Sequence, residues 1–253
     1  MSPSITRAGN AEILPLRARQ REELNCQIVH DSIHRRPGWT EGYLVGADGV
    51  IAGFGSVAVA GPWKDRPTVF EFYLLPEYRS QAFALFEPFL AASGASHFEV
   101  QSSDSLLMAL AVTHARDLAS ENIVFRDGGT TRWTAPGAAL RCLTPEDEIR
   151  ACMERRQGGG EWALEVDGAA AGKGGILFHY NRPYGDLYME VEEPFRRRGL
   201  GGFLVQELKR ECYALGAIPA ARCSLDNIPS RRTLQRAGFV PCAHILIGSF
   251  ALP

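Results

Sequence analysis

Short runs of alternating apolar and polar residues fill much of the chain, and they end repeatedly at turn-forming residues. Two such runs end at Asp48-Gly49 and at Asp167-Gly168. An Asp-Gly pair between alternating runs is a strong signal for a tight β-hairpin. We therefore expect two hairpins, each followed by a further strand. The strands expected after the turns are 50–60 and 68–75 in the first stretch, and 169–179 and 186–192 in the second.

A helical spacing of apolar residues replaces the alternation after each of these strands. Apolar residues recur about every 3.6 positions from Leu200 to Leu215, and a shorter set does so from Phe83 to Leu90. Further short elements are expected after both helices. They are the strands 97–101 and 219–224, the helices 105–114 and 229–236, and a last strand over 239–250.

The two stretches resemble each other in sequence as well as in the order of their elements. Asp48–Gly55 and Asp167–Gly174 share an Asp, an Ala and several Gly at matching positions. The repeated order β-β-β-α-β-α-β predicts an α+β fold with two tandem domains, each a mixed, mostly antiparallel sheet flanked by helices. The boundary is expected near Pro136, which gives the domains 1–136 and 137–253.

Composition narrows the class of protein. The 253 residues are 45% hydrophobic and 22% charged, and the net charge of −2 gives no reason to expect a nucleic-acid partner. The chain has neither an apolar run of about 18 residues nor a secretory signal pattern at its start, so we expect a cytoplasmic protein with no membrane contact. The six cysteines form no CxxC pair and are expected to be reduced thiols.

The histidines and the N-terminal segment suggest little chemistry. His30 and His34 lie four positions apart, but no Glu completes a zinc-binding pattern, so we expect a pair on a helix surface and no metal. The first 40 residues carry several charges, Arg17 and Arg21 among them, and are expected to form a charged helix without an assigned role.

The most informative segment is Met189 to Gly202, between a predicted strand and a predicted helix. Its core is Arg196-x-x-Gly199-x-Gly201. Amide groups at a helix N-terminus are unpaired and carry a partial positive charge, and glycines let a phosphate approach the main chain. Arginines at 196–198 add positive charge. The segment is neither a P-loop nor a GxGxxG motif, and it predicts a pyrophosphate-binding loop.

A second signature follows in the segment Asn227-Ile-Pro-Ser230, which leads to Arg236-Ala-Gly238-Phe239. With both signatures in order, the stretch from about Gly160 to Phe250 resembles the GNAT acetyltransferase superfamily. The resemblance implies a GNAT-like fold for each domain and acetyl-CoA as co-substrate, without a metal. It also implies an N-acetyltransferase that transfers the acetyl group to an amine of a small molecule or peptide by direct attack in a ternary complex.

The resemblance also implies roles for particular residues. The amide groups from Arg197 through Gly202 are expected to cradle the pyrophosphate, and the strand before them to run beside the pantetheine arm. Asn227 is expected to contact the cofactor or to order its loop. The predicted cofactor-binding residues are Met189, Glu190, Val191, Arg196, Arg197, Arg198, Gly199, Leu200, Gly201, Gly202 and Asn227.

The first stretch lacks this loop. At the matching place it reads Pro76-Glu-Tyr-Arg79-Ser-Gln, without glycine, and the Cβ atoms of Ala82 and Ala84 are expected to crowd a phosphate. We therefore expect a degenerate GNAT-like domain that binds no cofactor.

The catalytic residues are less well defined by sequence. A general base could come from Asp186, Glu190 or Glu192, of which Glu190 and then Glu192 are preferred, although these acids could instead pair with the arginines of the loop. Leu234 occupies the position of the tyrosine acid that the family often has.

Tyr188, Tyr213 or water could replace that acid, with Cys223 as a further option, and Tyr188 completes the predicted catalytic set. Two other hypotheses remain open, a regulatory acyl-CoA sensor without turnover and a purely structural module. The acceptor and the oligomeric state stay open as well.

Overall fold

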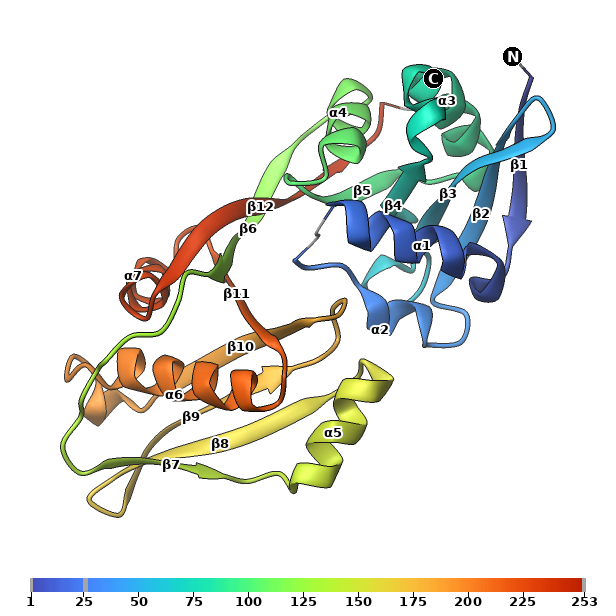
Figure 1. The fold of residues 1–253 in the computed structure, drawn as a ribbon. Coiled ribbons are helices and arrows are strands. Elements are labelled where there is room, and N and C mark those ends of the chain that lie inside the picture. Colours follow the sequence, from blue (N-terminus) through green and yellow to red (C-terminus); the bar gives the residue numbers. More distant parts are fainter. Residues whose placement is uncertain (1, 25–26, 252–253) are drawn as a thin grey trace. The chain divides into compact units, whose positions relative to one another are not determined.

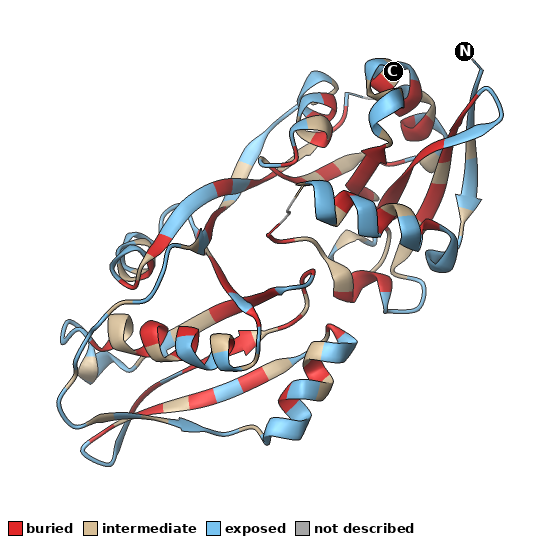
Figure 2. Cartoon of the chain, in the orientation of Figure 1, coloured by how far each residue is buried: buried red, intermediate tan, exposed pale blue. Residues whose placement is uncertain are grey.

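The computed structural model describes residues 2–24 and 27–251, and the chain divides into two compact units. Unit 1 contains Met1–Cys26, Ile33–Glu121 and His244–Pro253, and unit 2 contains Gln27–Ser32 and Asn122–Ala243. In each unit helices flank a mostly antiparallel sheet (Figure 1), and buried residues gather where strands and helices face each other (Figure 2). The predicted α+β class is therefore confirmed.

The described strands of unit 1 form a sheet in the order β1-β2-β3-β4-β5-β12. All neighbours pair antiparallel except β4 and β5, which are parallel. The strands are β1 (Pro3–Ala8), β2 (Thr40–Ala47), β3 (Val50–Ala58), β4 (Thr68–Leu74), β5 (His97–Gln101) and the part of β12 (Phe239–Ser249) that begins at His244. The helices are α1 (Asn10–Leu24), α2 (Asp31–His34), α3 (Ala82–Ser93) and α4 (Ser105–Thr113), with the 3-10 turns Gly61–Trp63 and Pro76–Gln81.

Unit 2 has the strand order β6-β11-β10-β9-β8-β7 among its described residues, and only β10 and β11 are parallel there. Its strands are β6 (Ala119–Asp127), β7 (Ala138–Cys142), β8 (Gly159–Val166), β9 (Ala169–Leu177), β10 (Tyr184–Val191) and β11 (Ile218–Ser224). Its helices are α5 (Glu146–Arg155), α6 (Leu200–Ala214) and α7 (Ile228–Arg236), with a 3-10 turn at Glu193–Phe195.

Both Asp-Gly pairs form the expected hairpins. Asp48 and Gly49 have φ angles of 49° and 82°, and Asp167 and Gly168 have angles of 50° and 78°. Two successive residues with positive φ are typical of the type I′ turn, whose twist matches that of the flanking strands. The two turns join β2 to β3 and β8 to β9 in antiparallel pairs. The sequence repeat therefore corresponds to a repeat in structure.

Each unit completes its sheet with the last strand of the other sequence copy. β6 follows α4 in the first copy but pairs with β11, where Cys223 lies opposite Ile123. β12 follows α7 in the second copy but pairs with β5, where Leu246 lies opposite Val100. The compact units therefore differ from the predicted division near Pro136, because the two copies exchange their last strands.

The N-terminal segment differs in part from the predicted charged helix. The strand β1 precedes α1, and two arginines of that helix form ion pairs with the buried Glu71, Arg17 at 3.4 Å and Arg21 at 3.0 Å. Burial alone would raise the pKa of Glu71, but Arg17, His34 and Arg21 hold it well below its ordinary value. The charges of α1 therefore face a buried carboxylate.

His34 belongs to the same buried cluster. Its Nε2 lies 2.9 Å from a carboxylate oxygen of Glu71, and burial lowers the pKa of its imidazole. The expectation of a histidine pair on a helix surface is therefore wrong for His34, since α2 ends at this residue and buries it.

Arg156 is a buried cation that fixes the start of β10. It is 2% exposed, and its guanidinium donates hydrogen bonds to the carbonyl oxygens of Tyr180, Asn181 and Tyr184 at 2.6 to 3.1 Å. Three carbonyl groups of one loop are therefore held by one side chain. This loop leads directly into the strand that carries the candidate site described below.

Arg156→Met is expected to lower the free energy of unfolding by about 2 kcal/mol, because buried carbonyl groups lose their donors. Arg155→Met is the control, since the guanidinium of this exposed neighbour contacts the Cys152 sulfur at 3.7 Å and its loss should cost under about 0.5 kcal/mol. Urea unfolding of the two variants and the parent measures the difference. Equal stability of both variants would contradict the anchoring role of Arg156.

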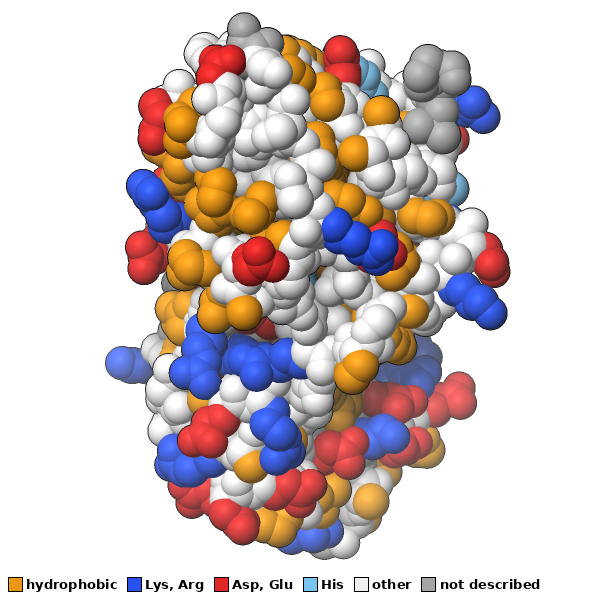
Figure 3. Space-filling model, turned by 90° about the vertical axis from the view of Figure 1, so that its right-hand side faces the viewer, with side chains coloured by type: hydrophobic (Ala, Val, Ile, Leu, Met, Phe, Trp, Pro, Cys, Tyr) orange, Lys and Arg blue, Asp and Glu red, His pale blue; other side chains and the backbone are white. Residues whose placement is uncertain are grey.

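Other general features are ordinary. No helix within residues 2–24 and 27–251 is long and apolar enough to cross a membrane. The cysteines at 142, 152, 212, 223 and 242 are free thiols, and Cys26 lies outside the described residues. On the face shown in Figure 3, basic and acidic side chains are both present and neither kind covers the surface.

Candidate functional site

The two central strands of unit 2 separate after a short parallel contact. β10 and β11 pair over 184–187 and 218–221, whereas β10 continues to pair with β9 as far as Val191. Beyond Leu187, one edge of β10 therefore has no strand partner in the described part of the chain. A slot of about 210 Å³ opens where the strands diverge.

The slot has lining residues on both faces of the sheet, because successive side chains of a strand point to opposite faces. One face of the sheet is covered by α6. Gly174 pairs with Met189 and shares its face, and a Cβ atom placed on Gly174 would lie 2.7 Å from the Leu208 side chain of α6. We call the opposite face, which carries Leu177, Asp186 and Tyr188, the far face. On the helix side the slot is lined by Leu187, Met189, Val205, Ser230 and Leu234, and on the far face by Leu177, Asp186, Tyr188 and Arg222.

The predicted loop leads into the N-terminus of α6, on the helix side. The first hydrogen bond of the helix joins the amide of Phe203 to the carbonyl of Gly199 at 3.2 Å. The amide groups of Leu200, Gly201 and Gly202 come before it and have no acceptor within the helix. Together with the dipole of a 15-residue helix, they form a site suited to an anion.

The glycines of the loop allow this approach. Gly199 has a φ of 80°, in the left-handed region, and a Cβ atom placed on it would meet nothing within 4 Å. A Cβ on Gly201 would lie 3.2 Å from the Thr233 side chain of α7. Any side chain at Gly199 would therefore project into open space beside the unpaired amides, and a side chain at Gly201 would disturb the contact between α6 and α7.

The arginines of the loop are exposed and differ in their contacts. Arg196 donates to the carbonyl of Val191 at 2.9 Å, which ties the loop to the end of β10. The guanidinium of Arg198 lies 5.5 Å from the centre of the Phe195 ring. Arg197 takes a φ of 61°, so the backbone turns sharply between its neighbours. The loop therefore brings three positive charges to the N-terminus of α6.

Asp186 is the most unusual acid of the slot. It is 4% exposed, its Oδ2 accepts a hydrogen bond from Arg222 Nε at 3.3 Å, and His179 Nε2 lies 3.8 Å from the same oxygen. Its Oδ1 is buried and has no hydrogen-bond partner within residues 2–24 and 27–251. Burial raises the pKa of Asp186 to about 6, although Arg222 counteracts the rise. A buried acceptor with an unpaired oxygen and a pKa near neutrality is suited to accept a proton.

Tyr188 lies next to Asp186 on the far face and lines a second pocket as well. Its phenol donates a hydrogen bond to Glu161 at 2.8 Å. Burial and this hydrogen bond raise the pKa of Tyr188, so its proton is retained at neutral pH. The second pocket, of about 380 Å³, shares Leu177 and Tyr188 with the slot.

The two glutamates preferred as bases lie outside the slot lining. Glu190 and Glu192 are both exposed. Glu190 follows Tyr188 along the far face and lies opposite Lys173 on β9, while Glu192 follows the end of the strand. Sequence reasoning named Asp186 among the possible bases but ranked it last. The available signal was its position in the first half of the strand, between Gly185 and Leu187, where an acid is expected to be buried.

The second signature orders α7. The side chain of Asn227 accepts a hydrogen bond from the Ser230 amide at 3.0 Å and so caps the helix, which places Ser230 and Leu234 along the slot. Leu234 is buried and offers no proton. Tyr213, another candidate acid, instead donates to Asp127 at 2.7 Å, and neither residue lines the slot.

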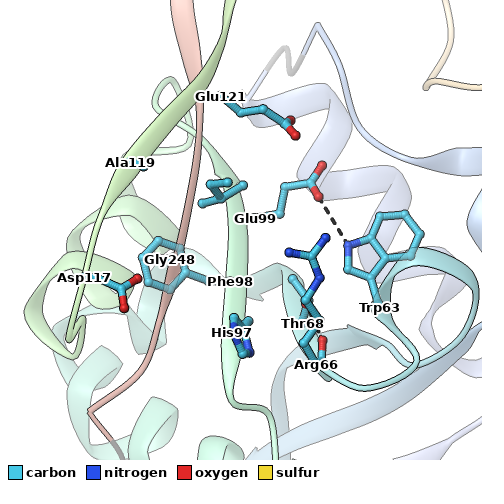
Figure 4. A pocket seen from close by; sticks show the side chains of 11 residues that line it. Trp63, Arg66, Thr68, His97, Phe98, Glu99, Asp117, Ala119, Glu121 and Gly248 are labelled. Atoms are coloured by element: carbon cyan, nitrogen blue, oxygen red, sulfur yellow. Dashed lines mark hydrogen bonds between the residues drawn. The ribbon is translucent and has the colours of Figure 1, made fainter.

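Unit 1 has a similar separation of strands but a different loop. β4 and β5 pair only at Thr68 with His97 and at Val69 with Phe98. A 3-10 turn without glycine, Pro76–Gln81, leads straight into α3. A pocket of about 240 Å³ in this unit lies elsewhere. It has a mixed lining of acidic and basic side chains in which the Trp63 indole donates to Glu99 at 3.3 Å (Figure 4).

Comparison with known proteins agrees with this geometry. Residues 130–239 match the model of the acetyltransferase (GNAT) family. No curated protein matches the chain. Among solved structures, a GNAT-family acetyltransferase from Colwellia psychrerythraea is similar with a TM-score of 0.72 and 14% identity, over 98% of this chain and 99% of that one.

Two further structures are similar over nearly their whole length. A tandem GNAT protein from the clavulanic acid biosynthesis pathway has a TM-score of 0.65 and 14% identity, over 100% of this chain and 99% of that one. A GCN5-related N-acetyltransferase from Sphaerobacter thermophilus has a TM-score of 0.59 and 17% identity, over 98% of this chain and 95% of that one. At these identities the likeness concerns the fold.

The fold and the family match together define the class of this protein. It has the fold of a tandem GNAT protein, with a helix N-terminus and a slot between parallel strands in unit 2. Residues 130–239 match the GNAT acetyltransferase family model, in agreement with the two sequence signatures.

Proposed function

We propose that this protein is an N-acetyltransferase that binds acetyl-CoA in unit 2 and transfers the acetyl group to an amine by direct attack. The observation that carries the proposal is the slot at the β10–β11 separation. One side of its lining includes Val205 of α6, and the other includes the buried Asp186, whose Oδ1 has no hydrogen-bond partner among the described residues. A co-substrate with a phosphate at one end and a reactive acyl group at the other suits this arrangement.

The residues of the loop suit the pyrophosphate. The amides of Leu200, Gly201 and Gly202 and the charges of Arg196, Arg197 and Arg198 provide donors and positive potential on the helix side. The unpaired edge of β10 from Met189 to Val191 offers main-chain groups for the amides of a pantetheine arm. Asn227 contributes by capping α7.

On the far face, the residues of the chain move protons. Asp186 Oδ1 accepts a proton from the attacking amine while Arg222 holds the other oxygen in place. The amine nitrogen forms a bond to the acetyl carbon, the carbon–sulfur bond breaks, and the Tyr188 phenol supplies a proton to the leaving sulfur. Positioning of the two substrates contributes much of the rate enhancement in such a direct transfer.

The proposal is tested by incubating the purified protein with acetyl-CoA and a panel of primary amines. Release of the CoA thiol and an acetylated amine detected by mass spectrometry are the expected results. Binding of acetyl-CoA without turnover on any amine would instead support the acyl-CoA sensor, which the apolar Leu234 favours. Absence of binding would leave a structural module.

Tyr188→Phe is expected to lower kcat by about a hundredfold, because the leaving sulfur then lacks a nearby donor. Tyr213→Phe is a matched control, since it removes the same atom and also breaks a hydrogen bond to a carboxylate in unit 2. Steady-state rates with one amine compare the two. An equal loss in both variants would show that Tyr188 acts through stability alone, and a loss confined to Tyr213→Phe would make that residue the acid.

A further inference from the structure

The pocket that adjoins the slot on the far face has an acidic lining. It is formed by the segment from Leu143 to Pro145 and by parts of α5, β8, β9 and β10. Its two charged lining residues are both acidic, Glu148 of α5 and Glu161 of β8, and neither Lys, Arg nor His lines it. The electrostatic potential in this pocket is therefore negative, whereas that beside the α6 loop is positive.

Further charged residues surround the pocket, and several of them are acidic. The first turn of α5 also carries Glu146 and Asp147, and Glu146 is paired with Arg150 at 2.6 Å. The far face also carries basic side chains, Lys173 of β9, Arg141 of β7 and Arg222 of β11, none of which is in the pocket lining. Arg141 is paired with Glu165 at 2.8 Å and Arg222 with Asp186 at 3.3 Å, so the charge of the pocket lining itself is negative.

The pocket adjoins the proposed reaction site, with which it shares two lining residues. Leu177 and Tyr188 line both spaces, and Asp186 with its unpaired Oδ1 lies on the slot side of Tyr188. The Tyr188 phenol donates to Glu161, which orients that carboxylate at the junction. A molecule in the pocket could thus place one end beside Asp186 while its other end lies near the glutamates.

We propose that the acceptor is a diamine, with one amino group bound in its neutral form at Asp186 and a second, protonated amino group held by Glu148 and Glu161. This inference rests on the proposed function and adds the charge class of the substrate. β10 and β8 are separated by two strand spacings, about 10 Å. The two amino groups should therefore be linked by a flexible chain of about four to six carbons.

Three acceptors of one chain length test the second charge: diaminopentane, pentylamine and aminopentanoate, which carry a positive, a neutral and a negative far end. The diamine should have a kcat/KM at least about tenfold above that of pentylamine, and aminopentanoate the lowest. Glu148→Gln should reduce the preference for the diamine by about fivefold through KM, and added salt should reduce it as well. Glu154→Gln, at the far end of α5 and outside the pocket lining, is the control.

Calorimetric binding of the same three amines to the protein separates this inference from the proposed function. A diamine that binds most tightly but is not acetylated would support the acidic pocket and contradict the acetyltransferase. Acetylation of all three amines at similar kcat/KM, or a diamine preference that Glu148→Gln leaves unchanged, would overturn the inference and leave the proposed function intact. Tighter binding of aminopentanoate than of the diamine would overturn it as well.

Discussion

Asp186→Asn is expected to lower kcat for amine acetylation by about a thousandfold, while the affinity for acetyl-CoA stays within about threefold. The substitution keeps the shape of the side chain but removes the group that accepts the proton. In the parent protein, activity should fall as the pH drops below about 6, because Asp186 becomes protonated there. The pH profile of kcat/KM measures this fall in activity. The residual activity of Asp186→Asn should not fall in this way below about pH 6.

The same substitution should stabilise the fold at neutral pH. Burial raises the pKa of Asp186 to about 6, so the folded state holds this proton more tightly than the unfolded state. The parent therefore loses stability as the pH rises from about 4 to about 6, and the loss persists above that range. Asp186→Asn should be more stable than the parent by about 2 kcal/mol at pH 7.5, a difference that shrinks toward pH 4.

Measuring both the activity and the stability of Asp186→Asn distinguishes a loss of the base from a loss of the folded structure. A variant that is more stable and less active has not lost activity by unfolding. Glu190→Gln tests the alternative that sequence reasoning preferred. If Glu190→Gln removes the acidic limb of the profile and Asp186→Asn does not, Glu190 is the base and the assignment to Asp186 is wrong.

Gly199→Trp is expected to weaken acetyl-CoA binding at least a hundredfold. Nothing lies within 4 Å of a Cβ atom at this position, so an indole would occupy the space in front of the unpaired amides of α6. The left-handed φ of 80° adds strain of about 1 kcal/mol, which affects folding rather than the ligand. Calorimetric titration with acetyl-CoA measures the affinity.

Gly168→Trp provides the matched control. Gly168 has a φ of 78°, a Cβ atom there would also meet nothing within 4 Å, and it lies in the hairpin turn between β8 and β9 of the same unit. The strain is therefore the same, but the loop is untouched. Equal affinity of the two variants for acetyl-CoA would contradict the assignment of the binding site to the α6 loop.

Much of the fold could be predicted because its signals are local. The Asp-Gly turns, the alternation beside them and the 3.6-residue spacing of the helix after β10 each depend on neighbouring residues. The exchange of β6 and β12 could not be predicted, since pairing between distant strands leaves no local pattern. β1 was missed because the charged α1 dominates its surroundings, and those charges pair with Glu71 on β4, which sequence spacing does not reveal.

The residues of the candidate site also differ in how far the sequence could predict them. The loop from Arg196 to Gly202 was predicted because a helix start with glycines and arginines is a contiguous signal. The sequence favoured Glu190 over Asp186 as the base. The reason is that burial raises the pKa of Asp186, and burial depends on the residues that cover the strand, which the sequence does not show. Glu148 and Glu161 were not singled out, since α5 and β8 bring them together only in the folded chain.

Calorimetric titration of the parent protein with acetyl-CoA tests the proposed cofactor site in unit 2 directly. Unit 2 has the glycine loop and unit 1 does not, so we expect saturable binding with one acetyl-CoA per chain. Failure to bind would contradict both the site and the proposed acetyltransferase. Binding of two molecules per chain would show that unit 1 retains a site, and that the glycine loop is not what determines cofactor binding in this protein.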